Sequence, residues 1–416
     1  MSDKRVVVTG MGAVTPLGND VKTFWENAVN GVSGAARITR FNPEKFKTQF
    51  ACEVKDFDPK LRLERNEIKR TDLYTQFGID AAAQAIDDAG FEFDKMDPFD
   101  VGVIWGTGQG GLETLEKEVQ NYTTNGFEPR FNPFLIPKML GNMAGGMIAL
   151  KYGYMGINFS TVSACATSNT SIMDAMNYIK LGKAKIIVTG GSEAPVTEAS
   201  IGGFSAMKAL STRNDNPESA SRPYDPDRDG FVMGEGGGAL VLEDYEHAKA
   251  RGAHIYAELV GSSMTNDAYH MTATHPEGLG AYQAMKLALN EGHINPSEVD
   301  YINTHSTSTP VGDISEPQAI RRLMEGQTNN ASISGTKSMT GHLLGAAGVV
   351  EAILSINSII HNIIPPTINT ESIDPVIGDD LDIVIKEARE KEVKIAMSNT
   401  FGFGGHNGIA VFRELK

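Results

Sequence analysis

The chain carries one pattern of segments twice, and this internal repeat restricts its fold more than any other feature of the sequence. A helix-like segment over residues 80–90 ends in glycine, and a strand-like segment follows over residues 101–105. The same order returns later, with a helix-like segment over residues 281–292 and a strand-like one over residues 301–304. Such alternation is typical of largely parallel or mixed sheets that are covered by helices. The alternative is that the two stretches are similar by chance.

Each copy also contains a glycine-rich stretch that we expect to form a hairpin, over residues 230–242 and residues 401–412. The two copies meet near residues 251–254. We therefore predict an α/β protein of two similar halves, residues 1–253 and 254–416, which pack as layers of one body.

Composition argues against several classes of protein. The 416 residues contain no run of roughly 18 apolar residues, so we predict no membrane span. The chain leads at once into a strand-like segment, residues 6–9, unlike a signal peptide. Two cysteines make a disulfide scaffold implausible and fit a reducing cytoplasm. The net charge of −15 argues against nucleic acid as a partner, but allows an acidic protein partner where a local basic patch exists.

Three stretches predict surface structure. Residues 61–70 are charged at helical spacing and indicate a solvated helix. Residues 121–138 contain three prolines and no periodicity, so we expect an excursion over the surface or near a partner subunit. Residues 214–229 are polar and broken by proline, which predicts a loop.

Cys165 stands where a strand-like segment, residues 157–161, turns into a helix-like segment that continues to about residue 181. A thiol at a helix N-terminus ionises more easily, because the aligned peptide dipoles favour the thiolate. Small residues surround it, so a substrate could approach closely. The alternative is a small buried hydrophobe, which is the usual environment of a free cysteine.

Two histidines follow strand-like segments in the same way. His305 comes after residues 301–304, and His342 comes after residues 332–334, near the start of a helix rich in small residues. A helix N-terminus favours neutral imidazole, and a neutral N–H can donate to a developing oxyanion. Either histidine alone would more often be structural. Together with Cys165 they suggest a thiolate nucleophile with imidazole partners.

Five motifs resemble one family across nearly the whole chain: Val6–Gly12, Ser163–Ala166, Asn303–Thr309, Lys337–Ala347 and Ser398–Gly405. The family is the elongating β-ketoacyl-[acyl-carrier-protein] synthases, and the chain looks most similar to synthase II. The resemblance implies the thiolase fold, in which duplicated halves form a five-layer α-β-α-β-α arrangement. It also implies a homodimer that works in fatty acid biosynthesis.

The resemblance implies a two-stage reaction. Cys165 takes an acyl group from acyl-carrier protein as a thioester, and malonyl-carrier protein then loses CO₂ to give an enolate that attacks it. The enolate oxygen would receive N–H donors from His305 and His342. By the same resemblance Lys337 orients the second histidine and supports the site electrostatically. No carboxylate base is needed, because loss of CO₂ generates the carbanion without removal of a proton.

Further positions take their roles from the resemblance alone. Backbone N–H groups of Cys165 and Phe403 would hold the oxyanion of acyl transfer, and Phe401 matches a gating phenylalanine. The resemblance implies that Thr307 and Thr309 contact phosphopantetheine and that Gln109 and Phe204 contact the substrate. It implies that the carrier protein docks on Lys69, Arg70 and Lys208. A structural monovalent cation would be held by Asn303, Glu351, Ser398 and Asn399. No cofactor is required, since phosphopantetheine arrives on the carrier.

The chain departs from the family pattern at three positions. Ser306 stands where glycine is usual, which predicts a stiffer loop after His305. Gln109 replaces an apolar residue of the acyl pocket, and Asn66 replaces a lysine of the docking patch.

Related classes fit less well. A thiolase would have a second active cysteine near the C-terminus, and none lies in residues 401–407. The initiating synthase III pairs histidine with asparagine, whereas this chain has His342. A non-catalytic chain-length factor would lack Cys165. A polyketide ketosynthase remains the nearest enzymatic alternative. The motifs do not distinguish synthase I from synthase II.

Overall fold

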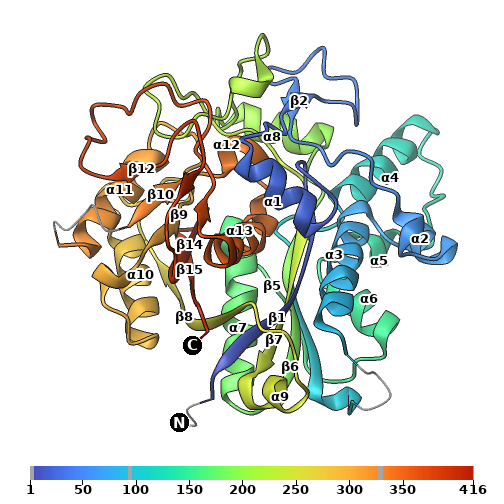
Figure 1. Cartoon of the computed structure of the whole chain (residues 1–416). Helices are drawn as coiled ribbons and strands as arrows, with labels where there is room; N and C mark the ends of the chain where they lie inside the picture. Colours follow the sequence, from blue (N-terminus) through green and yellow to red (C-terminus); the bar gives the residue numbers. More distant parts are fainter. Residues whose placement is uncertain (1–3, 92–95, 326–330, 416) are drawn as a thin grey trace.

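A computed structural model describes residues 4–91, 96–325 and 331–415 of the chain (Figure 1). Its central feature is one hydrogen-bonded run of eleven strands. In spatial order these are β5 (Asn158–Thr161), β4 (Val101–Gly106), β6 (Ile186–Glu193), β7 (Gly236–Asp244), β1 (Val6–Val14), β8 (Ala257–Asn266), β15 (His406–Arg413), β14 (Ile395–Gly402), β9 (Tyr301–Asn303), β10 (Ser332–Ser334) and β12 (Asp382–Ile383).

The run consists of two half-sheets with the same internal plan. In each, parallel strands (β4, β5 and β6, or β9, β10, β12 and β14) continue into an antiparallel pair. The halves meet where β1 pairs with β8, over only three residue pairs that run from Val6↔Leu259 to Val8↔Ala257. Beyond this short seam the half-sheets diverge, and helices fill the space between them.

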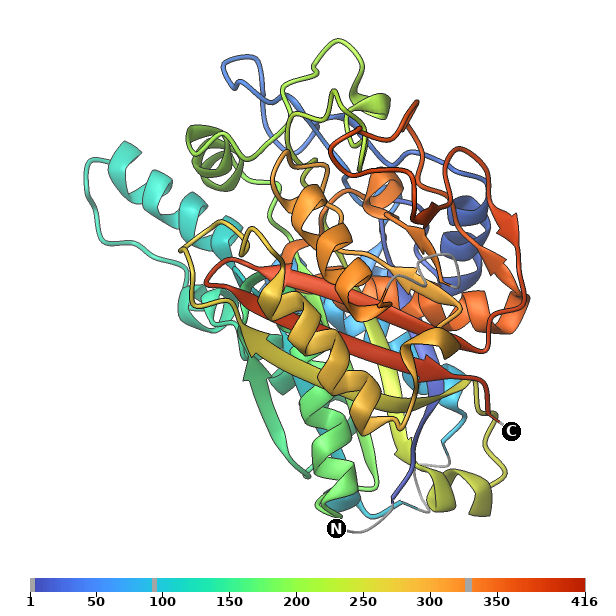
Figure 2. The ribbon, with the colours of Figure 1, turned by 90° about the vertical axis from the view of Figure 1, so that its left-hand side faces the viewer.

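Helices complete five layers (Figures 1 and 2). α3 (Leu73–Ala89) and α6 (Met143–Tyr152) cover the outer face of the first half-sheet, and α10 (Leu279–Glu291) with α11 (Gly312–Leu323) covers that of the second. α7 (Thr167–Lys180) and α13 (Ala347–His361) lie between the half-sheets and contact strands of both. The predicted thiolase-type fold of duplicated halves is therefore confirmed.

Side-chain composition explains the middle layer. Every residue of α13 up to Ile359 is buried, and its isoleucines and valines join the largest core cluster. A helix that is apolar on all sides must be covered on all sides. Among the described residues, the stretch Leu344–His361 is long and apolar enough to cross a membrane, but 89% of it is buried inside the protein. It is the core helix of this fold.

The remaining elements lie around these layers. They are α1 (Val21–Val29), α2 (Arg65–Arg70), α4 (Leu112–Thr124), α5 (Leu135–Met139), α8 (Glu198–Ala206), α9 (Tyr245–Ala250) and α12 (Lys337–Thr340), with the two-residue strands β2 (Ala36–Arg37), β3 (Phe50–Ala51), β11 (Ile363–Ile364) and β13 (Arg389–Glu390) and the short 3₁₀ turns Pro59–Leu61, Pro98–Asp100, Ala164–Ala166, Pro217–Ser219, Pro296–Glu298 and Leu344–Ala346.

Several local predictions need correction. The hairpin expected over residues 230–242 does not form, because residues 231 and 233 make isolated bridges and β7 pairs with β6 and β1 instead. The second expected hairpin is present as β14 and β15. The helix expected over 61–70 covers only α2, after a separate 3₁₀ turn. The excursion over 121–138 begins inside α4, which projects at the left of Figure 2, and contains α5.

Candidate active site

Cys165 lies in a tight turn between β5 and α7. Ala164 adopts a positive φ of 49°, and the turn is one 3₁₀ segment before the helix begins. The hydroxyl of Thr167 fixes it by donating to the carbonyl of Ala164 at 2.6 Å and accepting from the N–H of Ser163 at 2.9 Å. The sequence prediction of a strand-to-helix turn at Cys165 is confirmed, with the helix itself starting two residues later.

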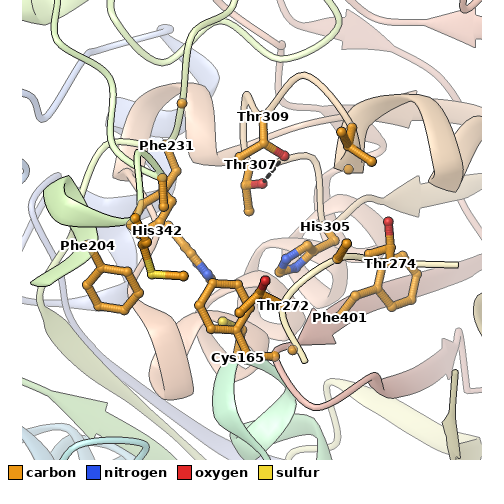
Figure 3. Close-up of a pocket in the computed structure, with 18 of the residues that line it drawn as sticks. Cys165, Phe204, Phe231, Thr272, Thr274, His305, Thr307, Thr309, His342 and Phe401 are labelled. Atoms are coloured by element: carbon orange, nitrogen blue, oxygen red, sulfur yellow. Dashed lines mark hydrogen bonds between the residues drawn. The ribbon is translucent and has the colours of Figure 1, made fainter. Parts of the chain in front are cut away.

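The thiol faces a cavity of about 330 Å³ (Figure 3). Cys165, His305 and His342 all line it, so residues far apart in the sequence converge on one space. The two imidazole rings lie 5.3 Å apart, centroid to centroid, at an angle of 88°. Figure 3 shows both rings directed toward the space above Cys165.

Backbone contacts hold each histidine. The N–H of His305 donates to Glu316 at 3.0 Å, just after β9 ends. The N–H of His342 donates to the carbonyl of Val232 at 2.7 Å, in the segment between α12 and the 3₁₀ turn that precedes α13. α13 begins five residues after His342, so the expected position at a helix N-terminus is wrong.

Both imidazoles are nevertheless neutral, for a different reason. Burial and the charge of Lys337 hold the pKa values of His305 and His342 well below their usual range. Neutral rings can donate one N–H each to an oxyanion without carrying a full charge. The Nδ1 atom of each ring is buried and has no hydrogen-bond partner among the described residues.

The Cys165 thiol is protonated at rest. Burial raises its pKa to about 12, against the opposing effects of the Lys337 charge and the N–H of Phe403. The helix dipole predicted from the sequence does not outweigh this desolvation. The N–H groups of Phe403 and of Cys165 itself both point at the sulfur, where an acyl oxygen would form.

Lys337 is a buried cation at the start of α12. Its side chain is 1% exposed, and its ammonium forms an ion pair with Glu351 on α13. A buried lysine needs such a partner to stay charged. The ion pair therefore keeps a positive charge next to both imidazoles.

Four phenylalanines line the cavity and narrow it. Phe401 lies 5.5 Å from the ring of His305, and Phe204 lies 6.2 Å from Phe403, between ring centroids. Phe231, which the sequence did not indicate, stacks edge-on to His342 at 5.3 Å. It belongs to the segment that was expected to be a hairpin, which is why it was missed.

Hydroxyls line the opposite wall of the cavity. The Oγ1 atoms of Thr307 and Thr309 lie 3.2 Å apart (Figure 3). Arg228, itself buried, donates to the carbonyls of Thr309 and Pro310 at 3.1 and 2.9 Å and fixes this loop. Thr272 and Thr274 also line the cavity. They stand in an irregular polar stretch with no pattern that could have indicated them.

The residues that depart from the family pattern have defined contacts. Ser306 adopts a φ of 20°, and its hydroxyl is hydrogen-bonded to the hydroxyls of Thr304, at 2.6 Å, and of Tyr224. Gln109 does not line the cavity; its amide donates to the hydroxyl of Ser200 at 2.9 Å.

The expected docking residues lie on two elements. Lys208 is exposed at the mouth of the cavity. Lys69 and Arg70 are exposed on α2, together with Asn66, and the guanidinium of Arg70 lies 5.3 Å from the ring centre of Phe134.

The four residues expected to hold a cation are all buried: Asn303, Glu351, Ser398 and Asn399. Oxygen atoms of Glu351, Ser398 and Asn399 have no hydrogen-bond partner among the described residues. Unpaired buried oxygens are costly, and hard cations prefer such donors. Among the same residues there is no cluster of His, Cys, Asp and Glu for a transition metal. The oxygens therefore fit a hard cation.

Comparisons with known proteins show the family to which the chain belongs. The family described as "Beta-ketoacyl synthase, N-terminal domain" matches residues 3–248, and "Beta-ketoacyl synthase, C-terminal domain" matches residues 256–371. The 3-oxoacyl-[acyl-carrier-protein] synthase 2 of Coxiella burnetii is 48% identical over 416 residues, which is 100% of both chains.

Solved structures are similar over almost the full length. A beta-ketoacyl synthase from Burkholderia phymatum has a TM-score of 0.92 at 34% identity and covers 99% of this chain and 100% of its own. A type II polyketide ketosynthase in complex with its acyl-carrier protein has a TM-score of 0.90 at 35% identity, with the same coverage.

A thiol that faces two neutral imidazoles between the halves of a thiolase-type fold is the arrangement of the condensing acyltransferases. The chain belongs to the beta-ketoacyl synthase family, as its motifs predicted.

Proposed function

We propose that the chain is a 3-oxoacyl-[acyl-carrier-protein] synthase of type II, which condenses malonyl-carrier protein with an acyl group held on Cys165. The convergence of Cys165, His305 and His342 on one cavity is the observation that carries this proposal. The reaction lengthens the acyl chain by two carbons, as in fatty acid biosynthesis.

Acyl transfer comes first. The sulfur of Cys165 forms a bond to the acyl carbon, the carrier's carbon–sulfur bond breaks, and the thiol proton ends on the carrier's thiol. The N–H groups of Cys165 and Phe403, both directed at the sulfur, hold the acyl oxygen as it becomes negative. Phe401 lies beside His305 and gates the entry of the second substrate.

Decarboxylation follows. Loss of CO₂ leaves an electron pair on the malonyl carbon and negative charge on the thioester oxygen. His305 and His342 each donate an N–H to that oxygen, and Lys337 keeps both rings neutral. The new carbon–carbon bond forms as the enolate attacks the acyl group, which releases Cys165. No proton has to be removed from carbon, so no carboxylate base takes part.

The cavity wall explains how substrates are held. Thr307 and Thr309 present hydroxyls to the phosphopantetheine arm, and Phe204 presents an apolar face to the acyl chain. Gln109 lies outside this cavity and limits the acyl pocket there. No cofactor is required, and Asn303, Glu351, Ser398 and Asn399 would hold a monovalent cation that neutralises their buried oxygens.

The partner is an acyl-carrier protein, in its acyl and malonyl forms. Lys69, Arg70 and Lys208 supply the local positive charge that an acidic carrier needs, because long-range repulsion is screened beyond about 10 Å. The protein acts as a homodimer in the cytoplasm. Residues 1–253 form the half that carries the nucleophile, and residues 254–416 form the half that carries both histidines.

Turnover of acyl-carrier substrates of graded length, with malonyl-carrier protein, tests the proposal. Wild type should release 3-oxoacyl-carrier protein and CO₂, and Cys165→Ala should form no 3-oxoacyl-carrier protein. Condensation retained by Cys165→Ala would remove the proposed nucleophile. If iodoacetamide does not modify Cys165, a non-catalytic subunit is favoured, and repeated extension without reduction favours a polyketide ketosynthase.

A further inference from the structure

Glu193, the last residue of β6, is a fully buried carboxylate for which the mechanism above has no role. It accepts hydrogen bonds from the N–H of Gly108, from the N–H of Gln109 at 3.3 Å and from the hydroxyl of Thr107 at 3.3 Å. The N–H of Gly345 also donates to it. Among the described residues no cation neutralises it, and burial raises its pKa to about 7, so it carries its negative charge above that pH.

Two glycines leave room for this carboxylate. A Cβ atom at Gly108 would lie 2.8 Å from Glu193 Oε1, and one at Gly345 would lie 2.5 Å from the same atom. Gly108 belongs to the loop after β4, and Gly345 belongs to the turn that follows His342. Both loops therefore pack against this carboxylate.

Both loops border the nucleophile. A Cβ atom at Gly108 would lie 3.8 Å from the carbonyl of Ala164, the residue before Cys165. Leu344, next to Gly345, lines the cavity beside His342. A side chain that holds these two loops therefore holds two walls of the active site.

Charge links Glu193 to the thiol directly. The groups that face Cys165 are Lys337 of α12, which lowers the pKa of the thiol, and Glu193 of β6, which raises it. The two imidazoles in the cavity are neutral and add little. Tyr74 of α3 faces Glu193 from the other side, and the carboxylate helps to raise the pKa of that phenol.

We propose that Glu193 is a positioning residue, whose buried carboxylate joins the 107–109 loop to the turn behind His342, beside the backbone that precedes Cys165. The positioning role rests on the proposed condensation. Glu193 neither gives nor takes the thiol proton. It acts through its charge and through the loops that it holds.

The test uses two variants that separate the effect of the negative charge from the effect of side-chain length. Glu193→Gln keeps the length and removes the charge, whereas Glu193→Asp keeps the charge and shortens the side chain. Iodoacetamide alkylation of Cys165 is followed from about pH 8 to about pH 10, where Glu193 is ionised, because only the thiolate displaces iodide. This range lies below the ionisation midpoint of the thiol, so a shift of the midpoint is read as the fold-change in rate at a fixed pH. We expect the midpoint for Glu193→Gln to fall by about 0.5–1 pH unit, which is a rise of about 3- to 10-fold in rate below the midpoint.

Glu53→Gln is the matched control. Glu53 is also a buried carboxylate that accepts backbone N–H groups, those of Thr39 and Arg40, but it does not line the cavity. This control should leave the midpoint unchanged. An unchanged or higher midpoint in Glu193→Gln overturns the role of the charge.

Glu193→Asp tests the loops independently. Its midpoint should stay near that of wild type, while amide hydrogen exchange at Gly108 and Gly345 becomes faster and kcat for condensation falls more than KM rises. Unchanged hydrogen exchange in Glu193→Asp would overturn the positioning role. This measurement remains possible even if Glu193→Gln does not fold. Alkylation and exchange require no carrier protein, so a wild type that fails to condense would count against the proposed function alone.

Discussion

At the scale of single residues, burial and one cation set the chemistry of the site. The sequence placed Cys165 and His305 correctly in the turns that follow strands, because strands and turns have readable local patterns, whereas His342 lies after α12 and not at a strand end. It predicted neutral histidines for the wrong reason and an ionised thiol that the resting structure does not have. Desolvation depends on neighbours distant in sequence, such as Lys337, so no local pattern could show it.

Replacing Lys337 should shift the pH dependence of the reaction. Lys337 lowers the pKa of both histidines, so Lys337→Met should raise both and protonate the rings at higher pH. The acid limb of kcat/KM should therefore move upward in pH, with a larger loss near pH 6 than near pH 8. The double variant Lys337→Met/Glu351→Gln also removes the carboxylate that loses its ion-pair partner. It should move the acid limb in the same direction. A limb that stays in place would contradict this role.

Changing one imidazole should separate the two half-reactions. His342→Ala removes a donor to the enolate but leaves the N–H groups of Cys165 and Phe403 in place. Malonyl decarboxylation should fall by about 10²–10³-fold. Acylation of Cys165, measured by single-turnover loading from acyl-carrier protein, should change little. An equal loss in both steps would refute this division of roles.

At the scale of elements, the β14–β15 hairpin joins the sheet to the site. Its register pairs Phe401 with Asn407 and Gly402 with His406, which leaves residues 403–405 as the turn. The sequence predicted this hairpin correctly because its glycines fall at a turn. The similar glycine run over 230–242 failed as a hairpin because Gly236 enters a strand that pairs on both sides. Glycine content alone does not distinguish these outcomes.

A pair of glycine variants tests this turn. Gly404 and Gly126 have φ values of 82° and 80°. A Cβ atom at Gly126 would meet nothing within 4 Å, and one at Gly404 would meet only the ring of His406, at 3.2 Å. Gly404→Ala and Gly126→Ala should therefore each cost about 1 kcal/mol of folding free energy through backbone strain. Only Gly404→Ala should slow acylation and condensation, because its turn contains Phe403 and closes the strand end that carries Phe401. Equal activity in both variants, with matched losses in Tm, would show that the turn plays no part.

At the scale of the whole molecule, the site exists only where the two halves meet. Cys165 comes from the first half, whereas both histidines and Phe401 come from the second. The repeated strand–helix pattern allowed the layers to be predicted from the sequence. The short seam between β1 and β8, and the middle position of α7 and α13, could not be predicted, since they depend on pairing between the copies.

Buried carboxylates should make the stability depend on pH. Burial raises the pKa of Glu316 to about 7 from an ordinary value of 4.5, so the folded protein holds a proton that the unfolded chain has lost. Stability should therefore fall as the pH rises through this window. Urea unfolding at about pH 5 and about pH 8 should show wild type losing about 1–3 kcal/mol more than Glu316→Gln over this interval.

Glu128→Gln, a substitution of an exposed residue, is the control for this measurement. It should follow wild type at both pH values. The idea fails if Glu316→Gln shows the same pH dependence as wild type.

The two ends of the described chain share one carboxylate. Arg5 at the start of β1 donates to Glu258 at 2.7 Å, and Arg413 at the end of β15 donates to the same side chain at 2.9 Å. The connection near residues 251–254 is a surface segment between α9 and β8. The molecule is thus suited to circular permutation, in which a short peptide joins the old ends and new ends open near Gly252. The order of the two copies in the gene would then be reversed, with every strand and catalytic group left in its place.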